Sequence, residues 1–393
     1  MPDDIFILGG ARTPMADYTG KLKDFSAIQL GAIAARAALE RTGVPPAALD
    51  HVIIGNVLHT SPDAVYGARH VGLQAGLPVE VPALTVNRLC GSGIQAAISA
   101  AQMIRLNEAD VVLSGGMESM SQAPHVIRGL RSGLRLGQGA LEDSLWSALL
   151  DTHCGCTMAA TAENCAARYG VSRAEQDHYA VRSQQRADAA WKAGRLRDEV
   201  VPVEITTRKA VEVFAADDHM RPDTTVEGLA KLPAAFSKSG CVTAGNASGI
   251  VDGGAALLLA SAGAVRTHGL TPLARLTHWA TVGVEPTLMG MGPVPATRLV
   301  LQKAGLDLAD IDLVEVNEAF AAQYLSVEKE LGLDRDRVNV NGGAIALGHP
   351  LGMTGTRLLL TLVLELRRRG LRRGLATACI GGGQGIAAIV ETV

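Results

Sequence analysis

The feature that most constrains the fold is a three-part pattern that occurs twice along the chain. Residues 48–56 resemble residues 309–317, and both segments end a strand-like apolar run with an asparagine. Two further pairs follow in the same order, residues 84–91 with 338–343 and residues 109–116 with 375–382. Matches in one order predict a duplicated unit. We expect the two halves to face each other, with the loops after equivalent strands close to a shared pseudo-twofold axis.

Short apolar runs alternate with alanine-rich stretches in the first half. Strands are predicted at residues 5–8, 52–54 and 111–113, and helices at residues 30–40 and 94–106. This alternation is typical of an α/β protein in which helices cover a parallel or mixed sheet.

One long segment does not fit the repeat. Residues 121–249 carry scattered glycine, proline and charged residues, among them Arg128, Arg131 and Arg135. We interpret this segment as an insertion that forms its own lobe. The first half then comprises residues 1–120 and 250–268, and the second half comprises residues 271–393.

Bulk composition excludes several classes of protein. The chain has 393 residues, is 48% hydrophobic and carries a formal net charge of -3, so a large core is possible and nucleic-acid binding is not indicated. The most apolar late run, residues 358–364, is too short to span a bilayer. The N-terminus lacks the basic start and the long apolar run of a signal peptide. A soluble protein without a membrane span is therefore predicted.

The cysteines indicate a reducing compartment and no metal site. Six are present, at positions 90, 154, 156, 165, 241 and 379, without the spacing of a disulfide scaffold. Cys154 and Cys156 have one residue between them and no second pair, which argues against zinc. Free thiols and a cytoplasmic location are the simplest interpretation.

Two cysteines and one histidine lie in glycine-rich turns. Cys90 precedes Gly-Ser-Gly and an apolar helix, Cys379 precedes Ile-Gly-Gly-Gly, and His349 stands in Gly-His-Pro after further glycines. Glycines here would let the backbone approach a substrate closely. A thiol before a helix gains thiolate stability from the helix dipole. One thiol as nucleophile, one as proton carrier and an imidazole as base suit acyl transfer coupled to carbon–carbon bond chemistry.

Each of these residues also has a structural interpretation. Cys90 could be a buried core cysteine, since burial is common for this residue type. The glycines after Cys379 lack the lysine and hydroxyl residue of a phosphate loop, and they lie too near the C-terminus for a dinucleotide-binding unit. Asn317, at a predicted strand end, could either hold a water in an oxyanion site or cap the following helix. Spacing alone does not separate these two roles.

Taken together, five motifs make the chain resemble the thiolase family over essentially its whole length. They are Cys90-Gly-Ser-Gly, Gly115-Gly-Met-Glu-Ser-Met, Asn317-Glu-Ala-Phe, Gly348-His-Pro and Cys379-Ile-Gly-Gly-Gly. The resemblance implies a thiolase fold, with two βαβαβαββ halves in a layered α/β/α/β/α core plus an inserted coenzyme A-binding loop domain. It also implies no metal and no cofactor besides coenzyme A (CoA) and acyl-CoA as substrates.

By resemblance, the site residues acquire roles. Cys90 takes the acyl group, His349 activates it, and Cys379 moves the proton at the α-carbon. Asn317 holds a water in one oxyanion hole, and the backbone N–H groups of Cys90 and Gly381 form the other. The expected contacts with CoA and the acyl group are Ser248, Met158, Arg221, Phe236, Met289 and Phe320.

The predicted function is reversible condensation of acyl-CoA thioesters and thiolysis of 3-ketoacyl-CoA through an acyl-cysteine. The resemblance favours an acetyl-CoA acetyltransferase with short-chain substrates, assembled as a homotetramer through the insertion. Alternatives are an acyl-CoA or lipid-binding protein without turnover, and a decarboxylating ketoacyl synthase, which would use two histidines. Met353 and Thr354, among others, depart from the commoner family pattern and put acyl preference and CoA contacts in question.

Overall fold

The computed structural model describes residues 4–208 and 210–393 of the chain. Nine strands of its main sheet follow each other in the order β14-β15-β16-β13-β1-β12-β5-β3-β4. Those of the first half are β1 Ile5–Arg12, β3 His51–Gly55, β4 Ala83–Val86, β5 Val111–Glu118 and β12 Val251–Ser261. Those of the second half are β13 Ala274–Gly283, β14 Leu313–Val316, β15 Arg373–Ile380 and β16 Gln384–Thr392.

Strand pairing is the same in the two halves. β3 pairs in parallel with β4 and β5, and β14 pairs in parallel with β15 and through an isolated bridge between Val314 and Val338. From β5 through β12 to β1, and from β15 through β16 to β13, the pairing is antiparallel. β1 and β13 pair with each other and join the halves. The exact boundaries of the halves and of the insertion stay a prediction.

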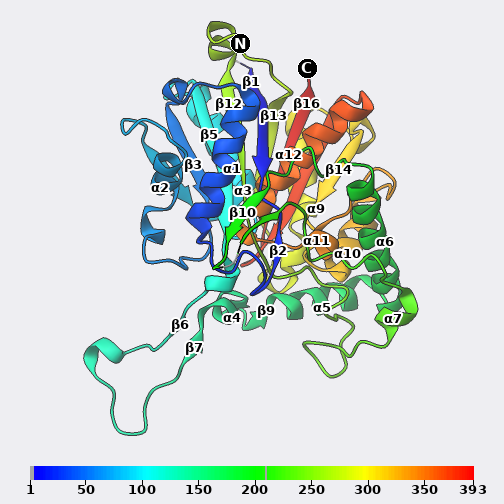
Figure 1. The fold of residues 1–393 in the computed structure, drawn as a ribbon. Coiled ribbons are helices and arrows are strands. Elements are labelled where there is room, and N and C mark those ends of the chain that lie inside the picture. Colours follow the sequence, from blue (N-terminus) through cyan, green and yellow to red (C-terminus); the bar gives the residue numbers. More distant parts are fainter. Residues whose placement is uncertain (1–3, 209) are drawn as a thin grey trace.

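Helices form three layers around the two halves of the sheet. α3 (Ser92–Arg105) and α12 (Leu351–Arg369) contact each other in the middle layer. α1 (Ala27–Thr42) and α2 (Gly67–Gln74) cover the outer face of the first half, and α9 (Pro293–Ala304) and α10 (Ala321–Leu331) lie outside the second (Figure 1). The mixed sheet with helices on its faces confirms the α/β class.

Side-chain alternation explains why the strands are buried on both faces. In β12, Leu257 and Leu259 join the central core with α3 and α12, whereas Leu258 joins the outer core beneath α1. In β16, Ile386 faces the central core and Ile389 faces the outer core of the second half. Successive residues of a strand point to opposite faces, so a strand covered on both sides must be apolar throughout.

The two central helices cross closely because each has a glycine at the contact. A Cβ atom at Gly93 would collide with the backbone nitrogen of Thr356, and one at Gly355 would collide with that of Ile94. Small residues at both positions let the helix backbones approach each other. This close crossing brings the beginnings of α3 and α12 together at one end of the molecule.

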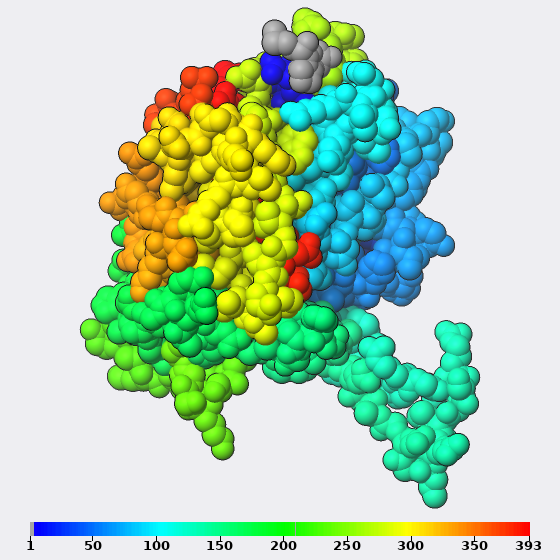
Figure 2. All heavy atoms as spheres, turned by 180° about the vertical axis from the view of Figure 1, so that it is seen from behind, coloured from blue at the N-terminus to red at the C-terminus, as the bar shows by residue number. Residues whose placement is uncertain are grey.

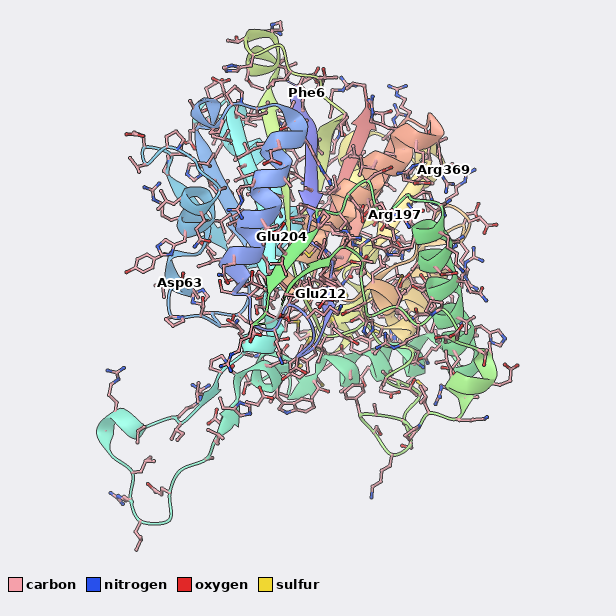
Figure 3. All side chains as sticks on the ribbon, viewed as in Figure 1. Phe6, Asp63, Arg197, Glu204, Glu212 and Arg369 are labelled. Carbon is pink, nitrogen blue, oxygen red and sulfur yellow. The ribbon has the colours of Figure 1, made fainter. Side chains whose placement is uncertain are left out.

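The insertion forms a lobe that covers that end and extends along the body (Figure 1). Its elements are β6 His125–Val126, β7 Glu142–Asp143, α4 Ser144–Ala148, β8 Leu150–Asp151, β9 Cys156–Thr157, α5 Met158–Tyr169, α6 Arg173–Lys192, β10 Val203–Thr206, β11 Val211–Phe214 and α7 Val226–Ala230. Figure 3 labels Glu204 and Glu212, which come from β10 and β11. The remaining short elements are β2 Ala16–Asp17, α8 Ala262–Thr267 and α11 Ala344–Leu347, and the 3-10 helices are η1 Pro46–Ala48, η2 Ala64–Tyr66, η3 Met120–Gln122, η4 Leu130–Ser132, η5 Pro286–Met291 and η6 Leu308–Asp310.

Residues 127–141, here called the arm, project away from the body between β6 and β7 (Figures 1 and 2). Its exposed apolar side chains are Ile127, Leu130, Leu134, Leu136 and Leu141. Single exposed apolar side chains are ordinary, but four leucines and an isoleucine on one thin loop mark a surface that another molecule can cover. Among the described residues, no helix is long and apolar enough to cross a membrane.

Candidate active site

The predicted catalytic residues gather at the end of the sheet that faces the insertion. The parallel strands β3, β5, β14 and β15 all run toward this end, and α3 and α12 begin there (Figure 1). Asn317 directly follows β14, Cys379 is the second-last residue of β15, and Gly381 follows that strand. Cys90 and His349 each lie two residues before a central helix. Loops after parallel strands are where open α/β sheets place ligand sites.

Cys90 is held in a tight turn between β4 and α3. Leu89 has a positive φ of 47°, which is uncommon for a residue with a side chain and is often found beside functional groups. Gly91 leaves room for Ile380, because a Cβ atom there would lie 2.5 Å from the Ile380 Cδ1 and would displace that side chain. The Cys90 residue is partly exposed, and it contacts the buried cluster of Met120, Leu145 and Leu351.

Opposing effects act on the pKa of the Cys90 thiol. Burial of the sulfur raises this pKa to about 11, and the nearby Glu118 carboxylate adds to the increase. The backbone N–H groups of Gly381 and Cys90 itself act in the other direction, because they interact with the sulfur and stabilise the thiolate. The thiol is therefore neutral at pH 7, and two N–H groups already converge on its sulfur.

Hydrogen bonds around Thr354 favour one tautomer of His349. Thr354 Oγ1 donates to the carbonyl oxygen of Pro350 at 2.9 Å and lies 2.6 Å from His349 Nδ1. Since the hydroxyl proton is used on Pro350, Nδ1 carries the hydrogen and donates to Thr354. His349 Nε2 then carries the lone pair that can accept a thiol proton, and Asn317 Nδ2 lies 3.3 Å from it. Burial, with the charge of Arg357, lowers the pKa of His349 to about 3, so the imidazole is neutral.

Asn317 faces His349 and does not cap a helix. Its Nδ2 lies 3.3 Å from His349 Nε2, and its backbone N–H donates to Thr377. The next helix, α10, begins at Ala321 with Phe320 as the N-cap residue, which settles against the capping role. Among the described residues, Asn317 Oδ1 is buried without a hydrogen-bond partner. A buried amide of this kind is suited to bind a water or a polar substrate atom.

Cys379 is fully buried at the end of β15, opposite Gly385 in β16. Burial raises the pKa of its thiol well above the ordinary value, and the nearness of Cys90 and Cys165 raises it further. The neighbouring Gly381 lies against Leu89 and Met158, so it links the second thiol to the turn of the first. The structure thus brings both thiols to one place.

A cavity of about 270 Å³ opens beside these residues. Its wall includes His349 and four of the predicted substrate contacts, Met158, Phe236, Ser248 and Phe320. Most of the other lining residues are apolar, namely Met120, Leu145, Trp146, Leu149, Ala159, Ala247, Ile250 and Leu351, together with Tyr18, Asp143, Thr157 and Gly249. An apolar cavity with a few polar groups is the usual form of a small-molecule site.

Two predicted contact residues lie elsewhere in this structure. Met289 is buried in the outer core of the second half and is not part of the cavity wall. Arg221 is outside the wall too, and its guanidinium pairs with Asp17 and donates to the backbone oxygens of residues 218–220. Sequence similarity gives the residue type at a position. Whether that residue contacts the cavity depends on side-chain packing, which the sequence does not show.

The glycines before His349 have a different task from the one expected. A Cβ atom at Gly348 would collide with Val251, and one at Gly343 would collide with the carboxylate of Glu318. Gly348 also has a φ of 96°, which favours glycine. These glycines therefore let the loop fit against the protein interior, and the expected close approach to a substrate does not explain them.

A buried carboxylate beside the site, that of Glu118, had no role predicted from the sequence. Glu118, at the end of β5, accepts hydrogen bonds from the backbone N–H groups of Val57, Leu58 and Gly352, and from Asn56 Nδ2. Its bond to Gly352 holds the first turn of α12, three residues after His349. Burial raises the pKa of Glu118 to about 7 despite these donors. The signal in the sequence was its place in the motif Gly115-Gly-Met-Glu-Ser-Met, in which the glutamate had no assigned role.

A second buried carboxylate holds the loop before His349. Glu318 accepts hydrogen bonds from Tyr179 and Ser183 of α6, from Asn339 Nδ2 and from the Ile345 N–H. This carboxylate ties the inserted lobe to the His349 loop. The described residues contain no group of three or more histidine, cysteine or acidic side chains that could hold a metal ion.

Comparisons with known proteins agree with this geometry. The thiolase N-terminal domain model matches residues 5–263, and the thiolase C-terminal domain model matches residues 270–392. The chain is 54% identical to human mitochondrial 3-ketoacyl-CoA thiolase, covering 99% of this chain and 98% of the human protein. It is 50% identical to an acetyl-CoA acetyltransferase of Pseudomonas aeruginosa, covering 98% of each.

Solved structures agree in fold. The crystal structure of the human mitochondrial enzyme superimposes with a TM-score of 0.98 and covers 100% of this chain and 99% of the human one. A second structure of that human enzyme, in complex with CoA, gives a TM-score of 0.97 at 54% identity and covers 100% of this chain and 98% of that one. The predicted thiolase fold is therefore confirmed.

One expectation is wrong. A cytoplasmic location was predicted, but the human and mouse relatives, each 54% identical, are named as mitochondrial enzymes. The prediction depended on free cysteines, which separate reducing from oxidising compartments and do not choose among reducing ones. The family itself is clear: because both domain models match and the relatives align over nearly the whole chain, this chain belongs to the thiolase family and is an acyl-CoA acyltransferase.

Proposed function

We propose that the chain catalyses thiolysis of 3-ketoacyl-CoA and the reverse condensation of two acyl-CoA molecules, with Cys90 as the acyl carrier. In thiolysis, the Cys90 sulfur attacks the 3-keto carbon and the bond between the second and third carbons breaks. Free CoA then takes the acyl group from Cys90. The observation that carries this proposal is the convergence of Cys90, Cys379 and the His349–Asn317 pair at one end of the sheet.

His349 acts as the base for Cys90 in this proposal. Support comes from its tautomer, since Nδ1–H is used on Thr354 and Nε2 remains an acceptor. A neutral thiol and a neutral imidazole at rest mean that the proton moves only when the sulfur attacks. The protonated ring can then donate to a substrate oxygen next to Asn317 Nδ2.

Cys379 is proposed to give the proton to the leaving carbanion in thiolysis and to remove it in condensation. Its burial and its raised pKa support this role, because the thiol keeps its proton until a strongly basic carbon forms beside it. Cys90 and Cys379 thus divide nucleophilic and acid–base work between two sulfur atoms.

Two oxyanion sites are proposed. The N–H groups of Cys90 and Gly381 would stabilise the oxygen of the acyl-cysteine, as they already converge on the Cys90 sulfur. His349 and Asn317 would stabilise the oxygen of the second thioester. Removal of one such donor typically costs on the order of 10²–10³ in rate.

Short acyl chains are the proposed substrates. One cavity of about 270 Å³ has to accept the pantetheine arm, near Ser248, Met158 and Phe236, as well as the acyl group near His349. Shared use of so small a cavity leaves little room for a long chain. A second candidate is activity on longer 3-ketoacyl-CoA, which is favoured by the apolar inner wall and by the 54% identity to the human 3-ketoacyl-CoA thiolase.

A homotetramer is the proposed assembly. The arm carries five exposed apolar side chains, and the edge strand β4 leaves one side unpaired with Leu84 exposed, in the same half as exposed Val65, Tyr66 and Val79. Edge strands and apolar patches of this kind are commonly covered by another chain. Light scattering would test this: wild type is expected as a tetramer, and Leu130→Asp with Leu136→Asp as a smaller species. A monomeric wild type would contradict the assembly.

The activity is tested with a series of 3-ketoacyl-CoA substrates of increasing length and free CoA. Wild type should consume the short substrates fastest, and Cys90→Ala and Cys379→Ala should be nearly inactive. Cys241→Ala is the matched control, because it removes a thiol that lies outside the cavity wall and does not act on the pKa of Cys379. A preference for long substrates would favour the second candidate. Full turnover by Cys90→Ala would overturn the proposed acyl carrier.

A further inference from the structure

A cysteine pair outside the catalytic residues lies in the turn of the β8–β9 hairpin. Leu150 pairs with Thr157, and Asp151 pairs with Cys156. Gly155, between Cys154 and Cys156, has a φ of 69° and donates its N–H to the oxygen of Asp151 at 2.8 Å. The chain therefore reverses direction at the Cys-Gly-Cys segment and holds its two cysteines in one turn.

The turn folds both cysteine side chains back onto the same short stretch of backbone. Cys156 Sγ donates to the carbonyl oxygen of Cys154 at 3.7 Å, so its side chain folds back over residue 154. Cys154 Sγ contacts the oxygen of Asp151 at 4.0 Å, within the same turn. Two residues of chain span at most about 7 Å, and disulfides join Cα atoms that are about 4.4–6.8 Å apart. The left-handed glycine shortens the span further.

Accessibility together with a near cysteine neighbour distinguishes this pair from the other cysteines, since Cys90 is also partly exposed but has no cysteine close to it in sequence. Cys154 and Cys156 are both partly exposed, whereas Cys165 and Cys379 are buried. Cys241 is partly exposed as well, but its sulfur donates to Glu163 and it has no cysteine neighbour in sequence. Only the hairpin pair, among the thiols of the described residues, combines a partner two residues away with access from solvent.

We propose that Cys154 and Cys156 form a reversible dithiol–disulfide site that reacts with low-molecular-weight disulfides. The thiolate of one cysteine attacks a sulfur of the small disulfide, whose S–S bond breaks and releases one thiol. The thiolate of the second cysteine attacks the resulting mixed disulfide and releases the second thiol. Two protein thiols are oxidised, one disulfide is reduced to two thiols, and the two protons pass to the released thiolates.

The reaction should be slow at neutral pH and should accelerate as pH rises. The pKa of Cys154 is raised above its ordinary value, first by burial and then by contacts that include Cys156 and Asp151. Only the thiolate attacks a disulfide, so its fraction limits the first step. A disulfide closed over three residues in a turn is exposed and strained, which makes it easy to reduce again.

Oxidation of Cys154 and Cys156 would change the cavity wall through the next two residues, Thr157 and Met158. The effect on CoA binding rests on the proposed function. Thr157 caps α5 by accepting the Ala160 N–H at 3.2 Å, and Met158 lies against Gly381. Both Thr157 and Met158 belong to the cavity wall. Because Cys156 directly precedes them, closing the disulfide moves the wall where the pantetheine arm is proposed to bind. We expect a several-fold increase in KM for CoA with little change in kcat.

Peptide mapping tests the site directly. The full-length enzyme is incubated with oxidised glutathione at pH 8.5, free thiols are blocked, and the tryptic peptide 136–168 is fragmented. The expected result is the loss of two hydrogen atoms between residues 154 and 156, with Cys165 blocked as a free thiol, and full reversal by dithiothreitol. Glutathione that remains on Cys154 or Cys156 without an internal bond would overturn the proposal.

Kinetics test the consequence with matched variants. The double variant Cys154→Ser with Cys156→Ser should keep the untreated KM and kcat and should lose the response of KM to oxidised glutathione. Cys241→Ser should still form the internal disulfide and respond like wild type. Loss of kcat in all variants would indicate attack on Cys90 and overturn the link to the hairpin. If no variant turns over substrate, the proposed function fails, while the peptide map still decides whether the disulfide site exists.

Discussion

An asparagine follows each of two equivalent strands, β3 in the first half and β14 in the second. Only the one after β14 faces the candidate active site. Asn56, after β3, donates to Glu118 at 2.9 Å and to the oxygen of Met117 at 3.3 Å. Asn317, after β14, has its Nδ2 3.3 Å from His349 Nε2. The duplicated scaffold therefore provides the position, and the group that each strand end meets decides whether the position serves structure or chemistry.

The two central helices also contribute different groups to the candidate active site. Cys90 lies two residues before α3, and His349 lies two residues before α12. The close crossing at Gly93 and Gly355 brings these two helix beginnings together. One half of the duplication thus contributes the candidate nucleophile and the other contributes its base. Variants in matched positions can separate these contributions.

The largest expected effect is the pH dependence of Cys90 alkylation. The pKa of Cys90 is raised to about 11 and that of His349 is lowered to about 3, so neither group titrates near pH 7. The thiolate fraction then rises about tenfold per pH unit below the thiol pKa. Alkylation by iodoacetamide, followed on the tryptic peptide 89–105, should increase in this way from pH 7 to pH 10.

Two further results test whether Cys90 and His349 are both neutral in the resting protein. His349→Ala should leave the slope unchanged, because a neutral imidazole does not hold a thiolate. A plateau that begins near pH 6–7 in wild type would instead indicate a preformed thiolate–imidazolium pair, and the neutral resting state would be wrong.

The two asparagines should separate activity from stability. Asn317→Ala should lower kcat for thiolysis by about 10²–10³, because an oxyanion donor is lost. Asn56→Ala should lower the free energy of unfolding by about 1.5–3 kcal/mol, because a hydrogen bond to the buried Glu118 carboxylate is lost. Steady-state kinetics and denaturant unfolding measure the two effects. If Asn56→Ala costs as much activity as Asn317→Ala, the comparison between the strand ends fails.

Much of this arrangement could be predicted from the sequence because it depends on local patterns. The repeated strand-plus-asparagine segment indicated matching halves, and the observed strand orders match. The sequence predicted a helix after Cys90 and a strand end at Asn317, and glycine-rich turns marked His349 and Cys379. Their convergence at one end of the sheet follows from the parallel direction of the strands that precede them.

The supporting contacts could not be predicted, because they join distant segments through exact register. Glu118 and Gly352 are 234 residues apart in the chain, and their hydrogen bond depends on how α12 sits against β5. Met289 and Arg221 illustrate the same limit, since both were predicted substrate contacts and neither belongs to the cavity wall. Thr354 was visible as a departure, but its bond to His349 was not.

The buried carboxylates should differ in their tolerance of an amide. Glu118→Gln places an N–H group opposite backbone donors that cannot turn away, so we expect a loss of about 2–3 kcal/mol in the free energy of unfolding. Glu318→Gln should cost less, about 1–2 kcal/mol, because each of its oxygens accepts from one hydroxyl that can rotate and accept, and from only one N–H donor. Denaturant unfolding of both variants measures the difference. Equal losses would show that the type of donor does not matter.

The smallest expected effect concerns the hydroxyl that orients His349. Thr354→Val keeps the shape of the side chain and removes the acceptor of the Nδ1–H, which should lower kcat by about tenfold, equivalent to one neutral hydrogen bond. Thr354→Ser restores the hydroxyl and should recover the activity, which a purely structural role of the methyl group would not allow. The KM for CoA should stay unchanged in both variants, since Thr354 is not part of the cavity wall. If Thr354→Val were fully active, His349 would keep its tautomer without this bond, and the positioning role would belong to Asn317 alone.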